Sequence, residues 1–444
     1  MKKLLSILMV VAMLLATFTG CANNQAADAP DVPVVDTPAA PAEKVELTVA
    51  IWGDEARKAA FEETLAPFCE ANNCTVNIQL VPAVELFSKL AAQIAAGTAP
   101  DVFWLADGNE GNFVSAGLLA DLKEALASDA NYMLDDFYKD AIYSTDYNGT
   151  GSIYGVPFSF GARAIFYNKT LFEAAGVETP ADCVANGTWT YEKMFELADA
   201  IHEYDSNKIG VKLWNSGQTT NGVQNFADIL AANDTNLMNA DSSEFMLDSE
   251  EGIGVTKMIL DAMNTGIHAQ PGDDAAFQSG NIAMARETYS SMKTVVASNV
   301  DFEWDVVPQP YGSAGADGKL YTGYAYWCAN ATSKNADLAV ELVKFVTNPE
   351  NQMAWSKTFM CPRASVMGSD TILNLGDGFP SAESIKAAYV DSVAERGLFT
   401  YRGTPDFAQL QTTVQQYYEM IWAGAYSVED GIAAMKDAVA PYLN

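Results

Sequence analysis

Two pairs of aromatic and acidic residues stand at the ends of apolar stretches. Trp52 and Asp54 follow the stretch VELTVAI, and Trp104 and Asp107 lie at the end of the stretch DVFWL and just beyond it. An indole offers a flat apolar face, and a carboxylate accepts hydrogen bonds from hydroxyl groups. These residue types favour the binding of a small polar molecule. Two structural interpretations stay open: the Trp residues pack in the core, and Asp54 caps the following helix.

The spacing of apolar residues predicts the elements that position these four residues. The expected elements are strands at 45–51, 75–81 and 101–105, and helices at 55–71 and 83–96, the second stopping at Gly97. Strands that alternate with helices predict a parallel sheet with right-handed crossovers. In open α/β sheets, ligands bind beyond the carboxyl ends of the strands, which is where the four residues fall.

The later part of the chain continues the mixed α/β pattern. The expected elements are strands at 163–168 and 304–308, a short helix followed by a strand within 277–285, and helices at 190–203, 336–347, 407–422 and 428–442. Asp248 and Glu251 predict a capping box for a helix that runs through Met263. A chain of 444 residues with this pattern suits two lobes rather than one core.

The charge of the chain excludes some partners. Lys and Arg number 25 and Asp and Glu 57, which gives a net charge of −32. Without residues 1–20, which contain Lys2 and Lys3, the balance is 23 − 57 = −34. Such a surface repels the phosphates of nucleic acids and the headgroups of anionic lipids. We therefore expect a small-molecule ligand and no nucleic-acid partner.

Metal-dependent and histidine-dependent chemistry has little support in the sequence. Only His202 and His268 occur, neither has the spacing of a metal ligand, and there is no CxxC or HExxH. We expect no metal, no cofactor and no catalytic residues.

The N-terminus has the features of a bacterial export signal. Lys2 and Lys3 precede the apolar run Leu4–Leu15, which is too short to span a membrane, and Phe18-Thr19-Gly20-Cys21 follows. Small residues before Cys21 resemble a lipoprotein cleavage site, after which the Cys becomes the lipidated N-terminus. An ordinary secretory signal with a chance Cys is the alternative. Residues 21–44, with four Pro residues, are expected to be a flexible linker.

Five further cysteines leave the disulfide pattern open. They are Cys69, Cys74, Cys183, Cys328 and Cys361. Cys69 with Cys74 and Cys328 with Cys361 are possible pairs in an exported protein, and buried free thiols are the alternative.

An ordered set of short segments resembles the family 1 extracellular solute-binding proteins. The segments are AAGTAPDVF at 95–103, YGVP at 154–157 with FYNKTLFEAAGVETP at 166–180, TWT at 188–190, FQSGNIAM at 277–284 and SKN at 333–335. Each segment alone is weak evidence, but their order and spacing cover residues 45–444. The best-known members of this family are the maltose- and oligosaccharide-binding subunits of ABC importers.

The resemblance implies an α/β, two-lobe periplasmic-binding-protein-like fold with three hinge crossings. By position, the crossings are expected near Val156–Phe160, Gly323–Cys328 and Phe359–Ala364. Lobe 1 would comprise 45–155 plus 329–360, and lobe 2 would comprise 161–320 plus 365–444. The ligand would lie between lobes that close over it.

A sugar-binding site needs flat aromatic rings for the sugar face and polar groups for the hydroxyls. The candidate ligand-binding residues are Trp52, Asp54, Trp104, Asp107, Arg163, Trp214, Glu287, Tyr289, Tyr324, Trp327, Tyr401 and Arg402. An ion pair across the hinge is the alternative interpretation of Arg163.

The expected function is capture of a sugar or oligosaccharide for the permease subunits of an ABC importer. The chain would be a monomer at the extracytoplasmic face of the cell membrane, held there by lipid on Cys21. A polyamine, peptide or other non-sugar ligand is an alternative that the negative charge permits. A secreted glycoside hydrolase is a further alternative, although no pair of acids stands out among the 57.

Overall fold

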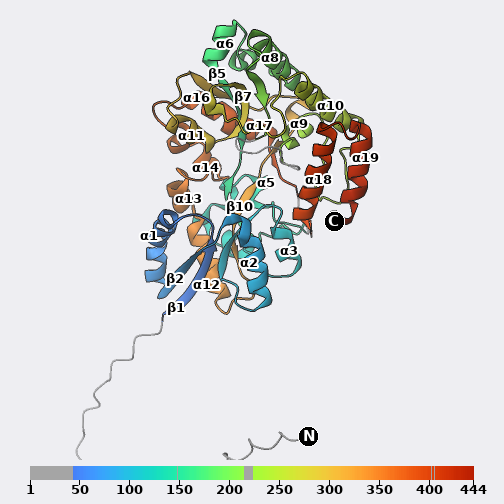
Figure 1. Cartoon of the computed structure of the whole chain (residues 1–444). Coiled ribbons are helices and arrows are strands. Elements are labelled where there is room, and N and C mark those ends of the chain that lie inside the picture. Colours follow the sequence, from blue (N-terminus) through green and yellow to red (C-terminus); the bar gives the residue numbers. More distant parts are fainter. Residues whose placement is uncertain (1–43, 148, 215–223, 402, 405) are drawn as a thin grey trace, which may run out of the picture. The chain divides into compact units, whose positions relative to one another are not determined.

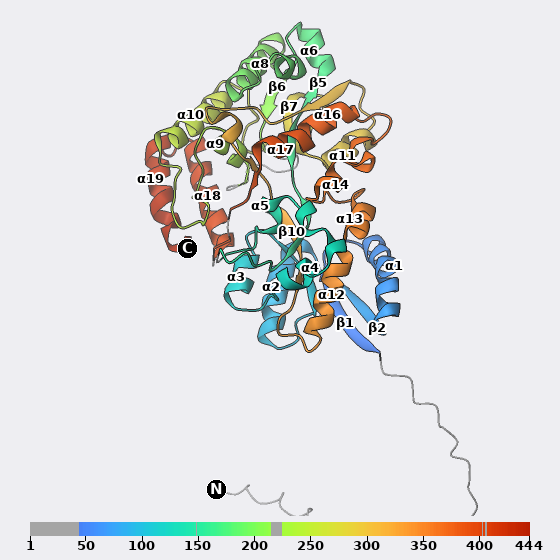
Figure 2. The same ribbon diagram turned by 180° about the vertical axis from the view of Figure 1, so that it is seen from behind.

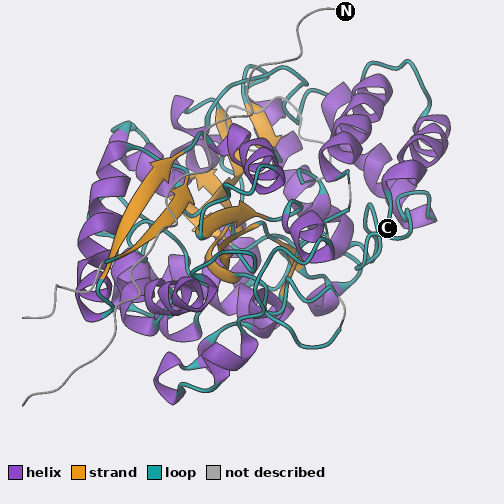
Figure 3. Ribbon diagram, turned by 90° about the horizontal axis from the view of Figure 1, so that it is seen from below, coloured by secondary structure: helices purple, strands orange, loops and turns teal. Residues whose placement is uncertain are grey.

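Two separate β-sheets organise the folded part of the chain. The computed structural model describes residues 44–147, 149–214, 224–401, 403–404 and 406–444. Residues Lys44–Asn444 form one compact unit. Figures 1 and 2 show its two main sheets from opposite sides, and Figure 3 shows the helices that surround the strands. The predicted signal peptide, Cys21 and the linker up to residue 43 lie outside the described residues.

The first sheet has five strands in the order β2-β1-β3-β10-β4. The strands are β1 (Val45–Ile51), β2 (Cys74–Leu80), β3 (Val102–Ala106), β4 (Val156–Phe160) and β10 (Tyr324–Ala329). β1 pairs in parallel with both β2 and β3, which confirms the predicted βαβ units. β10 is antiparallel to β3 and β4. We call this sheet and the helices packed on it the first lobe.

The first two crossover helices are placed by the strand order. α1 (Glu55–Ala71) leads from β1 to β2, and α2 (Ala83–Ala95) leads from β2 back past β1 to β3. Because the direction reverses at β2, right-handed crossovers put these helices on opposite faces of the sheet. The reversal also makes the carboxyl ends of β1 and β3 a topological switch point, where ligands bind in such sheets.

Aromatic packing fills the face of the first sheet that α1 covers. The Trp104 side chain is fully buried, and its ring centroid lies 4.4 Å from Phe158, 4.8 Å from Trp52 and 5.3 Å from Trp327. Phe61 of α1 packs edge-on against Trp104 at 5.6 Å. α12 (Ala336–Val346) lies beside α1 on this face.

The second sheet has four strands in the order β6-β7-β5-β8. They are β5 (Arg163–Asn168), β6 (Ile209–Lys212), β7 (Ile282–Thr288) and β8 (Trp304–Val307). β5 is antiparallel to β7 and β8, whereas β6 and β7 are parallel. We call this sheet and the helices packed around it the second lobe. These helices include α6 (Lys169–Ala175), α8 (Tyr191–Tyr204), α10 (Glu250–Asn264), α11 (Ser291–Ala297), α16 (Ala382–Lys386), α18 (Phe407–Trp422) and α19 (Val428–Val439).

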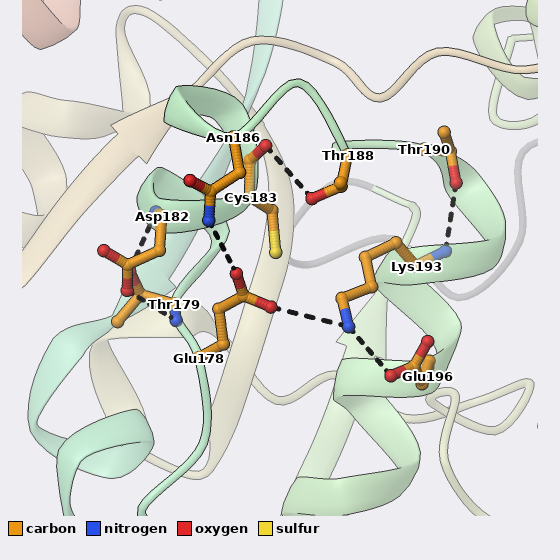
Figure 4. A network of polar contacts seen from close by, with 9 residues as sticks. All are labelled: Glu178, Thr179, Asp182, Cys183, Asn186, Thr188, Thr190, Lys193 and Glu196. Carbon is orange, nitrogen blue, oxygen red and sulfur yellow. Dashed lines mark hydrogen bonds and ion pairs between the residues drawn. The ribbon is translucent and has the colours of Figure 1, made fainter.

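A polar network holds α8 against the helix before it (Figure 4). α7 (Pro180–Ala185) begins with a capping box, in which Thr179 and Asp182 exchange backbone and side-chain hydrogen bonds of 3.0 and 3.2 Å. Lys193 of α8 reaches back to Glu178, with 3.5 Å between Nζ and Oε2. These contacts fix the entry of α8, whose N-cap is Thr190.

Three segments carry the chain between the two sheets. The first joins β4 to β5 through Gly161, and the second joins β9 (Leu320–Tyr321) to β10 through Gly323. These two run side by side, since the Gly161 N–H donates to the Gly323 carbonyl over 3.0 Å. The third follows α13 (Pro349–Trp355), where the Met360 carbonyl accepts from Phe160 N–H at 2.9 Å.

The start of α10 differs from the expectation. The predicted capping box of Asp248 and Glu251 is wrong: α10 begins one residue later than that box requires, and Ser249 accepts a 3.0 Å hydrogen bond from Gly252 N–H. Asp248 instead forms an ion pair with Lys436 of α19.

The five described cysteines are free thiols, four of them buried. Among the described residues, no helix has the length and apolarity needed to cross a bilayer.

We expect Trp104→Ala to lower the free energy of unfolding by about 3–5 kcal/mol, because it removes a large fully buried side chain and leaves a cavity. Urea or guanidinium unfolding of the variant measures this loss. Tyr204→Ala is the matched control, since Tyr204 is 54% exposed and its removal should change stability little. Equal effects of the two substitutions would contradict the packing described for Trp104.

Candidate functional site

The fold brings Asp107, Arg163 and Tyr324 together where the chain passes between the sheets. Asp107 follows β3, and its N–H donates to the Tyr324 carbonyl over 2.9 Å. A Cβ on Gly323 would lie 2.8 Å from Oδ1 of Asp107, so the carboxylate rests against this glycine. Arg163 is the first residue of β5, and its charge offsets part of the rise in the pKa of Asp107 that burial causes. Residues from three separate parts of the sequence therefore lie near the same crossing of the chain.

Aromatic rings of the second lobe support Arg163 from behind. Its guanidinium carbon lies 5.4 Å from the centroid of the Tyr321 ring, a cation–π contact. Tyr321 packs in turn on Tyr401, with 5.5 Å between the ring centroids. The Tyr401 hydroxyl donates to Oδ1 of Asn236 over 3.2 Å. Tyr401, predicted as a ligand contact, is 3% exposed and lies behind Tyr321 in this structure.

A buried ion pair holds the second-lobe side of the cluster in place. Arg286 of β7 donates from Nε to Oδ2 of Asp228 over 2.7 Å, and its Nη2 lies 2.6 Å from the same oxygen. The other carboxylate oxygen of Asp228 accepts from the Tyr321 N–H over 2.6 Å. Arg286 also donates to the Leu213 carbonyl. Asp228, in α9 (Ala227–Ala232), thus links β7 to Tyr321, whose ring lies against the guanidinium of Arg163.

The charges of this region balance only when both lobes contribute. Arg163 and Arg286 are opposed by Asp228 from the second lobe and Asp107 from the first. Burial, with a smaller contribution from the like charge of Arg286, lowers the pKa of Arg163 to about 10. Burial raises the pKa of Asp107 to about 6, against the opposing effects of Thr400 and Arg163. Asp107 is half-buried, unlike Arg163, which is buried.

Several polar groups in this cluster lack protein partners. Nε of Arg163 and the hydroxyl of Tyr324 are buried and make no hydrogen bond within the described structure. The one bond that Arg163 donates, from Nη1 to the Tyr321 carbonyl, is long at 3.5 Å. Leaving buried polar groups unpaired is costly, and such groups are rare in folded proteins. Donors and a carboxylate in this arrangement are suited to binding hydroxyl groups of a ligand.

The three tryptophans of the first lobe that were predicted as ligand contacts differ in how deeply they are buried. Trp104 and Trp327 are at most 2% exposed and belong to the aromatic packing under α1. Trp52 is half-buried at the edge of that packing and keeps an exposed part. Asp54 accepts a 2.8 Å hydrogen bond from Arg57 N–H and is the N-cap of α1.

The remaining candidates of the second lobe are held by separate contacts. Trp214 is fully buried and packs on His268 at 4.7 Å between ring centroids. Glu287 is 3% exposed and accepts from the Ser291 hydroxyl over 2.8 Å. The Tyr289 hydroxyl donates to the Ile372 carbonyl over 2.7 Å. Arg402 lies outside the described residues, as does Cys21.

Sequence reasoning missed four residues of the cluster: Asp228, Arg286, Tyr321 and Thr400. Two of them had a signal. Arg286 directly follows the apolar stretch IAMA, and Asp228 interrupts the apolar stretch FADILAA. A charge in or next to such a stretch indicates a buried ion pair. Tyr321 and Thr400 had none, because only the pairing of β9 with β11 (Leu398–Phe399) places them here. Among the described residues, no group of three or more His, Cys, Asp or Glu side chains is placed to hold a metal ion.

Solved structures of other binding proteins have the same fold. The cyclic α-maltosyl-1,6-maltose binding protein of Arthrobacter globiformis superposes with a TM-score of 0.74 at 21% identity, over 90% of this chain and 99% of that chain. An ABC substrate-binding protein of Listeria monocytogenes in complex with cycloalternan gives a TM-score of 0.71 at 20% identity, over 90% and 98%. At these identities the likeness establishes the fold.

Sequence comparison with curated proteins gives partial matches. A binding protein of Brucella abortus (strain 2308) is 34% identical over 151 residues, which is 32% of this chain and 33% of the relative. The chain thus spans about a third of the length of the first curated relatives it matches. The galactooligosaccharide-binding protein of Bacillus subtilis (strain 168) is 22% identical over 341 residues, 72% of this chain and 74% of the relative.

Two α/β lobes, three connecting segments and a polar cluster between them define a two-lobe binding protein. The profile of the family described as bacterial extracellular solute-binding protein matches residues 63–366, more than half of the chain. The chain belongs to this family. The resemblance found in the sequence and the two-lobe fold expected from it are therefore confirmed.

We expect Asp228→Asn to lower the free energy of unfolding by about 3–5 kcal/mol, since it leaves two buried arginines opposed by Asp107 alone. Chemical unfolding monitored by circular dichroism measures the change. Asp248→Asn is the control, because it makes the same substitution in the exposed ion pair with Lys436 and should have a small effect. A tolerant Asp228→Asn variant would show that Asp228 does not compensate the arginines.

Proposed function

We propose that this protein captures a sugar or oligosaccharide between its two lobes and delivers it to the permease of an ABC importer. The observation that carries the proposal is the cluster of Asp107, Arg163 and Tyr324 between the lobes. Nε of Arg163 and the hydroxyl of Tyr324 have no partners among the described residues, and Asp107 beside them is half-buried. A ligand rich in hydroxyl groups supplies both acceptors and donors, and it adds no charge to a region that is already balanced.

The names of relatives support a carbohydrate ligand. The Bacillus subtilis relative is a galactooligosaccharide-binding protein, and another, from Mycolicibacterium smegmatis, is an erythritol/L-threitol-binding protein matched at 26% identity over 34% of this chain. Structural neighbours are in complex with cycloalternan, alpha-D-tagatose or maltose. All of these ligands are polyols without charge, which agrees with the balanced charges of the cluster.

A polyamine or another cation fits the cluster less well. The acids that such a ligand would need are Asp54, Asp107 and Glu287, and each has different partners: a helix N-terminus, Arg163 and Ser291. The charge of Arg163 acts on Asp107 and would repel a cation that approached this carboxylate. A glycoside hydrolase would require two opposed carboxylates that face a sugar bond, whereas Asp107 faces a guanidinium.

The lobes and the membrane anchor are further parts of the proposal. We propose lobe 1 at 45–155 plus 329–360 and lobe 2 at 161–320 plus 365–444, with the ligand closing the space between them. The exported chain would begin at Cys21, carry lipid there, and act as a monomer next to its permease subunits. The family is extracellular by its description, which agrees with an anchor on the outer face of the membrane.

We expect one of four neutral probes, maltose, a galactooligosaccharide, erythritol or tagatose, to raise the melting temperature of the purified protein, because a ligand of the native state stabilises it. Spermidine is the probe for the cationic alternative. Calorimetry with the best probe should show binding that Arg163→Met weakens at least tenfold, since it removes the unpaired donors. Lys257→Met, in an exposed ion pair on α10, is the control and should bind like the wild type.

Three results would contradict the sugar proposal. They are stabilisation by spermidine with none of the neutral probes, cleavage of a bound oligosaccharide on long incubation, and equal binding by Arg163→Met and Lys257→Met.

We expect Cys21→Ser to move the protein from the membrane fraction to the soluble fraction of the producing cells, because it removes the acceptor of the lipid. Labelling with a radioactive fatty acid should mark the wild type and not the variant. A Cys21→Ser protein that remains in the membrane fraction would contradict the anchor.

A further inference from the structure

One short segment of the second lobe rests directly on a turn of the first. We call residues 398–401, 403 and 404 the strap, which leads from α17 (Ser392–Arg396) to α18. β11, at its start, pairs with β9 and belongs to the second lobe. Beyond β11 the strap lies on the turn Asp107–Gly111, which connects β3 to α3 (Glu110–Ser115) of the first lobe. The covalent crossings between the lobes lie elsewhere, so this is a separate contact.

Glycines permit this close approach of two backbones. A Cβ on Gly403 would lie 2.8 Å from the Gly108 carbonyl oxygen, and one on Gly111 would lie 3.1 Å from the Gly403 carbonyl oxygen. Gly108 has φ +83°, and its Cβ would lie 2.4 Å from the ring of Phe407, the first residue of α18. A side chain at Gly403 would force the strap and the turn apart, and one at Gly108 would collide with the Phe407 ring.

Side chains of the first lobe fasten the strap through a chain of hydrogen bonds. The Gly403 N–H donates to the Tyr147 hydroxyl over 3.2 Å. The Tyr147 hydroxyl donates to Oε1 of Glu110 over 2.5 Å. At the other end of the strap, the Thr400 hydroxyl donates to Oδ2 of Asp107 over 3.3 Å. The strap therefore touches the proposed ligand site directly at Asp107 and is held a few residues further on by Tyr147.

We propose that Tyr147 and Glu110 are positioning residues, which hold the strap of the second lobe on the Asp107–Gly111 turn and thereby keep the polar cluster in its ligand-binding arrangement. Tyr147 acts through Gly403, to which it is hydrogen-bonded, and Glu110 acts through Tyr147. The inference rests on the proposed function, because it assigns a role to residues beside the proposed ligand site.

Glu110 makes this contact sensitive to pH. It is 1% exposed, Oε2 has no partner, and the groups that face it are Asp107, Tyr147, Tyr326 and Cys328. Burial, with a smaller contribution from the charge of Asp107, raises the pKa of Glu110 from 4.5 to about 7. Lifting the strap exposes this side of the turn to water, where Glu110 returns toward its ordinary pKa.

The sign of the effect follows from this difference. Glu110 binds its proton more tightly when the strap is seated than when it is lifted. The seated strap therefore has a free-energy advantage that is complete below pH 4.5. The advantage falls as the pH rises and is lost once the pH passes about 7. The strap is therefore held more firmly under mildly acidic conditions than under alkaline ones.

Hydrogen exchange of the ligand-free full chain, read by mass spectrometry on peptides that contain Gly403, tests the proposal. We expect Tyr147→Phe to accelerate exchange in these peptides about tenfold at a fixed pH, because it removes the acceptor for the Gly403 N–H. Ser144→Ala is the matched control: it removes a neighbouring hydroxyl, which contacts Tyr326 over 2.9 Å and does not contact the strap. The control should exchange like the wild type.

Glu110→Gln separates the pH effect from simple loss of structure. After correction for the chemical exchange rate, opening of the wild-type strap should increase about tenfold between pH 5 and pH 8. Glu110→Gln keeps an uncharged side chain of the same shape and should show protection with a much weaker pH dependence, since only Asp107 then titrates beside the strap. The proposal is overturned if Tyr147→Phe exchanges like Ser144→Ala, or if the wild type and Glu110→Gln share one pH profile.

These measurements use no ligand, so they can fail or succeed independently of the sugar screen. If no neutral probe binds while the strap behaves as expected, the proposed ligand is wrong and the strap contact stands. If a probe binds, Tyr147→Phe should weaken it mainly through faster dissociation, whereas Ser144→Ala should not.

Discussion

The burial of Arg163 is the constraint on which the region between the lobes depends. Arg163 is 8% exposed and needs compensating negative charge, and the second lobe by itself offers one aspartate to two arginines. Asp107 of the first lobe supplies the second negative charge. The contact between the lobes is therefore electrostatic as well as steric, and it concentrates polar groups at a place where neither sheet could bury them alone.

The backbone makes this meeting possible. Gly161 and Gly323 lie in neighbouring crossing segments, and a hydrogen bond joins them. Gly323 has no side chain, so the carboxylate of Asp107 can lie against it, and Arg163 follows Gly161 by two residues. Small residues at a crossing serve two purposes here: they let the chain turn between sheets, and they leave space for charged side chains from both lobes.

The second lobe also contains a buried polar network of its own, formed by Asp228, Arg286 and Tyr321. Asp228 anchors Arg286 and the backbone of Tyr321, so the platform under Arg163 is fixed before any ligand arrives. The strap adds a contact that can form and break, since it is fastened by hydrogen bonds at Thr400 and Gly403 rather than by covalent connection. A rigid platform with a releasable contact is the arrangement that a protein needs if it must both hold a ligand and release it.

The sequence by itself determined the elements and the family, because both depend on local patterns. Apolar periodicity predicted β1, α1 and β5 with their observed bounds, and the order of short segments identified the solute-binding family. The sequence also predicted Asp107, Arg163 and Tyr324, which lie at strand ends or crossings, as ligand contacts, and that role stays a prediction. It could not separate Trp52 from the buried Trp104 and Trp327, since an indole at a strand end looks the same in a core or a site. Only the tertiary structure decided that question and brought Thr400 to Asp107, because those contacts join residues almost 300 positions apart.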